Sequence, residues 1–115
     1  IRKFVILLEN SIIETLKEFK IKSYSDRKNI GIWVKHNNKN KKIAAIGIKV
    51  RKWIAYHGFS INIKNNLEDF KKIIPCGLKN KEVTSLNEVS KIKYSEFTKK
   101  LELSLIKNLS ASNYF

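Results

Sequence analysis

The sequence predicts an α+β fold in which helices pack on a mixed or antiparallel sheet. Apolar residues recur with a helical period at the start of the chain and again near its end. Between these two stretches lie short alternating segments joined by polar turns, which is the pattern of strands linked as hairpins. A chain of 115 residues, 43% of them hydrophobic, is the right size for one such domain.

The first element is an amphipathic helix over about residues 2–19. Apolar side chains fall at three- and four-residue intervals, with charged and amide side chains such as Glu9 and Glu14 between them. The apolar positions are Ile1, Phe4, Val5, Leu8, Ile12, Leu16 and Phe19. One face of this helix is therefore expected to be buried.

A turn-rich stretch over residues 23–29 separates the first helix from the strands. The predicted strands cover residues 31–34, 42–50 and about 53–63. Residues 36–40 form a polar hairpin loop between the first two strands. The third strand is expected to be broken near His57-Gly58, since glycine weakens a strand interior.

Two helices and one strand complete the expected order. Asn65 or Asn66 caps a short helix that Pro75 ends, which leaves Cys76-Gly77 in a turn. Residues 82–86 form another short strand. The last helix begins near Ser95 and carries one apolar face made of Phe97, Leu101, Leu105 and Leu109.

The chain is strongly basic, with a formal net charge of +14. Arginine, which is the usual residue for bidentate recognition of bases and phosphates, supplies only three of the 24 basic residues. The lysines are scattered and form no block of like charge. We therefore expect no nucleic-acid partner, although an excess of lysine favours acidic partners in general.

The sequence indicates a cytoplasmic protein that does not contact a membrane. Its apolar runs are all shorter than the roughly 18 residues that a spanning helix requires. The first helix carries Glu9, Glu14 and Glu18, which a signal peptide would not.

Cys76 is the single cysteine, so it has no partner in the chain for a disulfide. It lies between Pro75 and Gly77, and this setting favours a side chain presented on a tight turn. A nucleophilic cysteine needs a nearby base or cation, for which His57 is the first candidate and a lysine the second. His36 lies in a polar loop, where we expect it to be solvated. The alternative is that Cys76 is a small buried hydrophobic residue.

Three motifs in register resemble the lipoyl(octanoyl) transferase family. The segment Lys42 to Val50 resembles the family's lysine-bearing strand, and His57 to Ile63 resembles its second signature. Ile74-Pro75-Cys76-Gly77 is similar to its cysteine turn, and Glu82 to Leu86 resembles the family's segment after that turn. The resemblance extends more loosely to the first helix and to Gly31-Ile32-Trp33-Val34.

This resemblance implies the fold of the biotin and lipoate protein ligases. It also implies transfer of an octanoyl group from acyl carrier protein to a lysine of a lipoyl domain, without a metal, ATP or other cofactor. Cys76 would carry the acyl group as a thioester, and Lys42 would lower the pKa of that thiol. The acyl chain would be lined by Ala45, Ile46, Gly47, Gly58, Phe59 and Ser60, and His57 becomes a pocket residue.

Two alternatives stay open at this stage. A lipoate or biotin ligase relative would adenylate its substrate and would not need Cys76. A non-catalytic basic module would bind nucleic acid or an acidic protein in a salt-sensitive way, and would not need Cys76.

The family also has arginine-glycine-glycine and histidine-glycine-proline-glycine segments in an earlier half, and neither is present here. The chain begins with Ile1 and contains no methionine. We therefore expect residues 1–115 to be the C-terminal part of a single catalytic domain whose N-terminal half is absent from this chain.

Overall fold

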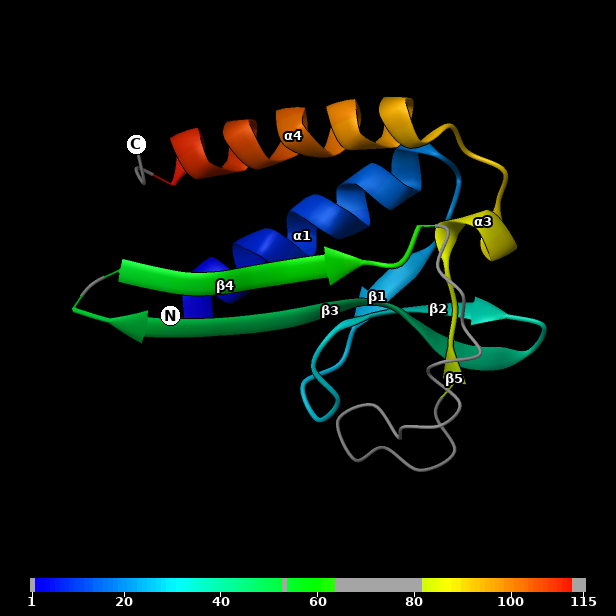
Figure 1. Ribbon diagram of the computed structural model, residues 1–115, viewed down its shortest axis with the longest axis horizontal. Helices are drawn as coiled ribbons and strands as arrows, with labels where there is room; N and C mark the ends of the chain where they lie inside the picture. The colour runs from blue at the N-terminus through cyan, green and yellow to red at the C-terminus, as the bar shows by residue number, and fades with distance from the viewer. Residues whose placement is uncertain (1, 53, 64–81, 113–115) are drawn as a thin grey trace.

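A computed structural model of the chain describes residues 2–52, 54–63 and 82–112. Two long helices lie together on one face of a five-stranded sheet (Figure 1). The helices are α1 (Arg2–Glu18), α3 (Leu86–Val89) and α4 (Tyr94–Ala111). The strands are β1 (Ser23–Ser25), β2 (Ile32–His36), β3 (Lys39–Arg51), β4 (Ile54–Ile61) and β5 (Glu82–Val83). The predicted short helix near residues 65–74 and the turn at Cys76 lie outside the described residues.

The sheet is mixed, as the sequence predicts. Strands β1 to β4 pair with one another in antiparallel order, whereas β5 pairs with β3 in parallel. The hairpin turn between β2 and β3 is made by Asn37 and Asn38, both with positive φ (53° and 61°). Asparagine tolerates this left-handed conformation, which a two-residue hairpin turn requires. The loop is therefore shorter than predicted, because pairing extends to His36 and Lys39.

The core lies between the sheet and the two long helices. Helix α1 buries Ile12 and Leu16 completely, and α4 contributes Phe97, whose ring centroid lies 5.8 Å from that of Phe19. The strands supply Ile32, Val34, Ile43 and Ala44 to the same cluster. The apolar face predicted for each long helix is thus confirmed.

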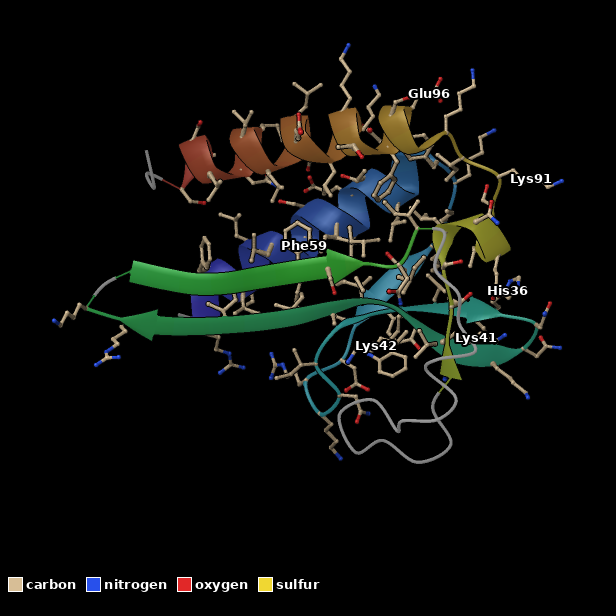
Figure 2. The ribbon with its side chains drawn as sticks, in the orientation of Figure 1. His36, Lys41, Lys42, Phe59, Lys91 and Glu96 are labelled. Carbon is tan, nitrogen blue, oxygen red and sulfur yellow. The ribbon has the colours of Figure 1, made fainter. Side chains whose placement is uncertain are left out.

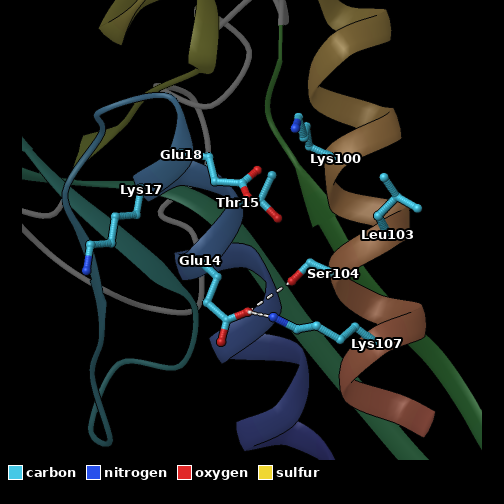
Figure 3. Close-up of a pocket in the computed structure, with 8 residues that line it drawn as sticks. All are labelled: Glu14, Thr15, Lys17, Glu18, Lys100, Leu103, Ser104 and Lys107. Atoms are coloured by element: carbon cyan, nitrogen blue, oxygen red, sulfur yellow. Dashed lines mark hydrogen bonds and ion pairs between the residues drawn. The ribbon is translucent and has the colours of Figure 1, made fainter. Parts of the chain in front are cut away.

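Polar side chains join α1 to α4 along one edge of that interface. Asn108 Nδ2 donates to the buried Ser11 Oγ at 2.8 Å, and Ser104 Oγ donates to Glu14 Oε2 at 3.1 Å. Beside them a groove of about 480 Å³ runs between the helices (Figure 3). Its lining side chains are Glu14, Thr15, Lys17, Glu18, Lys100, Leu103, Ser104 and Lys107.

Besides that loop, three local predictions differ from the structure. Ser23–Ser25, expected within a turn, forms the edge strand β1 because Tyr24 pairs with Trp33. Strand β4 is continuous through His57-Gly58, since Gly58 pairs with Gly47 and His57 with Ile48. Only the first two residues of the segment 82–86 form a strand; Leu86 begins α3.

Candidate active site

One extra residue in β3 determines which side chains share a face of the sheet. Ile32 pairs with Ala44 whereas the next residue, Trp33, pairs with Lys42, so Ile43 is the additional residue of a bulge. Ile43 and Ala44 both enter the core. Because paired side chains lie on the same face of a sheet, Lys42 and Trp33 lie on the face opposite the two long helices, hereafter the open face. Figure 2 shows Lys42 on that side of the sheet.

The open face continues from Lys42 as a row of small residues. Ala45 pairs with Ser60, and Gly47 pairs with Gly58. Ala45, Gly47 and Ser60 are exposed, and a Cβ atom placed on Gly47 or Gly58 would meet no atom within 4 Å. These four residues, hereafter the small-residue floor, leave a flat surface beside Lys42.

Ile46 and Phe59, the other two residues predicted to line the acyl chain, lie on the opposite face. They pair with each other and pack against the hydrophobic core. Figure 2 shows the Phe59 ring directed from β4 toward α1. The structure therefore separates the six predicted residues into four on the open face and two that support the sheet from behind.

Lys42 is only 5% exposed. Its Nζ lies 5.7 Å from the centroid of the Trp33 ring, which is within the range of a cation–π interaction. Its neighbour Lys41 pairs with Val34, a core residue, and is half-buried. Among the lysines whose side chains the structure describes, Lys42 alone is buried.

Described residues on either side of the segment 64–81, which contains Cys76, are hydrogen-bonded to β3 at Ile43 and Lys42. Before it, the Asn62 amide donates to the Ile43 carbonyl at 2.9 Å; after it, the Thr84 amide donates to the Lys42 carbonyl at 2.9 Å. Asn62 Nδ2 also donates to the Thr84 carbonyl at 3.2 Å, which joins these two flanking residues directly. Cys76 itself lies outside the described residues, so its place relative to Lys42 stays a prediction.

The two histidines are placed on different strands. His57 is the strand partner of Ile48 in the β3–β4 pair. His36 ends β2 opposite Lys39, at the hairpin turn.

Within residues 2–52, 54–63 and 82–112, no three His, Cys, Asp or Glu side chains gather as metal ligands. None of the helices in the same ranges is long and apolar enough to cross a membrane.

Sequence reasoning missed two residues that contact Lys42. The sequence pattern assigns Gly31 and Trp33 only to a strand, without a role. A signal was present: Trp33 alternates with Ile32 and Val34, which belong to the core, so its side chain had to lie on the other face.

The chain has the fold of the biotin protein ligases. It superposes on the biotin protein ligase of Aquifex aeolicus with a TM-score of 0.68, over 94% of this chain and 45% of that one, at 19% sequence identity. Residues 1–106 match the Lipoyl protein ligase A/B catalytic domain, and the chain belongs to this family. The predicted fold and family are therefore confirmed.

Curated relatives in this family carry the name octanoyltransferase. The protein of Ehrlichia chaffeensis is 50% identical over 98 residues, which cover 84% of this chain and 46% of that protein. The protein of Rickettsia bellii is 50% identical over 109 residues, which cover 93% of this chain and 52% of that protein. The chain thus spans about half the length of the curated relatives it matches.

Proposed function

We propose that this chain provides catalytic residues of an octanoyltransferase that carries its acyl group as a thioester on Cys76. The observation that carries the proposal is Lys42, a buried lysine on the open face of the sheet, beside a floor of small residues. An ammonium group beside a thiol favours its reactive thiolate form. The similarity to proteins named octanoyltransferase supports the same reaction.

The anchoring of β5 supports a role for Cys76 together with Lys42. Glu82 pairs with Lys41, and Cys76 precedes Glu82 by six residues. Six residues of extended chain span at most about 22 Å. This limit is compatible with the proposal that Cys76 and Lys42 act in one site.

In the first half of the proposed reaction, the Cys76 thiolate attacks the carbonyl carbon of an octanoyl thioester on acyl carrier protein. The bond between that carbon and the carrier sulfur breaks, and the octanoyl group becomes a thioester of Cys76. The departing carrier thiolate takes a proton from the Lys42 ammonium, so the carrier leaves as a neutral thiol.

In the second half, the amine of a lysine on a lipoyl domain attacks the Cys76 thioester. The nitrogen forms an amide with the octanoyl carbonyl, and the Cys76 thiolate departs. The proton lost by that nitrogen returns to the neutral Lys42 amine, which restores both residues to their starting state.

The small-residue floor suits an extended acyl chain. Ala45 and Ser60 have short side chains and Gly47 and Gly58 have none, which leaves room for a hydrocarbon chain to lie along the strands. Ile46 and Phe59 are assigned the supporting role of holding these strands against the core. The site of this proposal uses no metal, ATP or other cofactor, because a thioester is already activated.

Within this proposal the chain is the C-terminal part of the catalytic domain. The rest of the acyl site then comes from sequence outside residues 1–115. This arrangement accords with a match to about half the length of the curated relatives.

The test is the intact mass of the protein after incubation with octanoyl-loaded acyl carrier protein. It is applied to the chain itself, to the longest open reading frame that contains it, and to Cys76→Ser in both. We expect an octanoyl adduct on Cys76 that hydroxylamine removes and that is absent from Cys76→Ser.

Folded protein that gains no adduct in either form would exclude the thioester mechanism. Activity that survives Cys76→Ser and depends on ATP would instead indicate a ligase. Labelling of the longer protein alone would mean that the acyl site requires sequence beyond this chain.

A further inference from the structure

The side chain of Lys42 passes through a space that exists only because residue 31 is glycine. A Cβ atom at Gly31 would overlap Lys42 Cε and would lie 2.7 Å from the Ala44 carbonyl oxygen. The lysine can be displaced, but the Ala44 oxygen belongs to a paired strand and cannot move away easily. Gly31 also has a φ of 142°, which side-chain-bearing residues rarely adopt.

Trp33 forms the second wall of this space. It is the strand partner of Lys42, is 1% exposed, and has its ring centroid 5.7 Å from Lys42 Nζ. The indole Nε1 donates to the Asn29 carbonyl at 2.8 Å, which fixes the ring orientation.

The turn before β2 holds that carbonyl in place. Asp26 accepts hydrogen bonds from the Lys28 amide at 2.9 Å and from Asn29 Nδ2 at 3.1 Å. A series of contacts thus leads from Asp26 through Asn29 and Trp33 to the amine of Lys42.

We infer that Gly31 and Trp33 are positioning residues that fix the Lys42 amine for proton transfer. Gly31 leaves the passage through which the lysine side chain reaches the open face, and Trp33 holds the ammonium by its ring. This inference rests on the proposed function for the catalytic importance of Lys42. The position of the Lys42 amine can be measured without any transfer reaction.

The first measurement is the rate at which acetic anhydride modifies individual lysines, read by peptide mass spectrometry. In the unmodified protein we expect Lys42 to react roughly tenfold more slowly than the exposed Lys35 of β2, because its burial must first be undone. In Gly31→Ala we expect Lys42 to react as fast as Lys35, whose own rate is unchanged. Equal rates at Lys42 and Lys35 in the unmodified protein would overturn the inference.

The second measurement is octanoyl transfer by the longest active form of the protein. Gly31→Ala should lower kcat by roughly 100-fold, the cost of a catalytic group displaced by about 1 Å, with little change in KM for the carrier-bound donor. Trp33→Phe keeps a ring but loses the Nε1 hydrogen bond, and should lower kcat by roughly 2- to 30-fold.

Ile30→Ala and Tyr24→Phe are the matched controls, since both residues are exposed neighbours of the altered positions. Both should keep the unmodified kcat and labelling pattern. If Gly31→Ala does not fold, Trp33→Phe tests the positioning role instead, by the rate of Lys42 acetylation and by kcat for octanoyl transfer.

Folded variants with unchanged Lys42 labelling and unchanged kcat would refute the positioning roles. A protein that shows the predicted labelling pattern but transfers no octanoyl group would instead refute the proposed function, so the two failures are distinguishable.

Discussion

Burying a lysine costs free energy unless its ammonium is compensated, and Lys42 is only 5% exposed. The Trp33 ring at 5.7 Å offers part of that compensation. An apolar residue at position 42 would serve the fold at least as well. A lysine at this buried position points to chemistry rather than to stability.

Replacing Lys42 by methionine tests whether the lysine serves the reaction rather than the stability of the fold. Methionine keeps an unbranched side chain in the space above Gly31 but removes the ammonium. We expect the free energy of unfolding to stay the same or rise, whereas octanoyl transfer falls by roughly 10²- to 10⁴-fold. Urea denaturation and steady-state rates measure the two quantities, with the exposed Lys35→Met as control. Retained transfer in Lys42→Met would remove Lys42 from the mechanism.

Gly47→Val tests the small-residue floor. Its side chain would extend into the open space above the strand, so the fold should keep its stability. Transfer of an octanoyl group should fall by roughly tenfold or more relative to a butanoyl group, because the longer chain meets the new methyl groups. The ratio of kcat/KM for the two donors measures the effect, with the exposed Lys39→Val as control. An unchanged ratio would mean that the acyl chain does not cross this floor.

At this scale the family resemblance singled out Lys42 and the small-residue floor, and their roles stay predictions. It did not predict that Ile46 and Phe59 face the core, since the bulge at Ile43 shifts the alternation of β3 by one residue. Nor did it predict the contact of Lys42 with Gly31, which depends on side-chain paths that no local pattern encodes.

Among the elements, α1 and α4 are joined by hydrogen bonds as well as by apolar contact. Asn108 Nδ2 donates to Ser11 Oγ at 2.8 Å and to Glu14 Oε2 at 3.3 Å. Ser11 Oγ in turn donates to the Leu7 carbonyl and is fully buried. These bonds fix how the two helices align along their length.

Asn108→Ala should therefore destabilise the protein by about 1 kcal/mol, the usual net contribution of such hydrogen bonds. The free energy of unfolding in urea measures it, and the exposed Ser110→Ala on the same helix is the control. Equal stability of the two variants would show that the Asn108 hydrogen bonds add no measurable stability to the α1–α4 contact.

The long helices were the best predicted elements, because their 3.6-residue apolar period continues over four turns or more. The short elements were predicted less well. Ser23–Ser25 has no apolar alternation and becomes a strand only by pairing with Ile32 to Val34. The parallel pairing of β5 with β3 joins residues about 40 positions apart in sequence, and no local pattern reveals it.

For the whole molecule, a net charge of +14 favours association with acidic proteins. If the donor is an acidic carrier protein, raising the salt concentration from about 0.05 M to about 0.5 M should lower kcat/KM, since screening weakens the attraction. The octanoyl thioester of N-acetylcysteamine, which has no protein part, should show no such loss. An equal salt effect on both donors would exclude electrostatic docking of the carrier.

The bulge at Ile43 also limits how this strand can change in evolution. Deleting one residue there would restore regular pairing between β3 and β2. Every later side chain of β3 would then move to the opposite face of the sheet. Ile46 would then lie on the open face in place of the small-residue floor, and Ala45 and Gly47 would face the helices and leave the core underfilled. A single-residue deletion at position 43 is thus a change that would abolish both stability and the site, although it removes no residue from either proposed catalytic role.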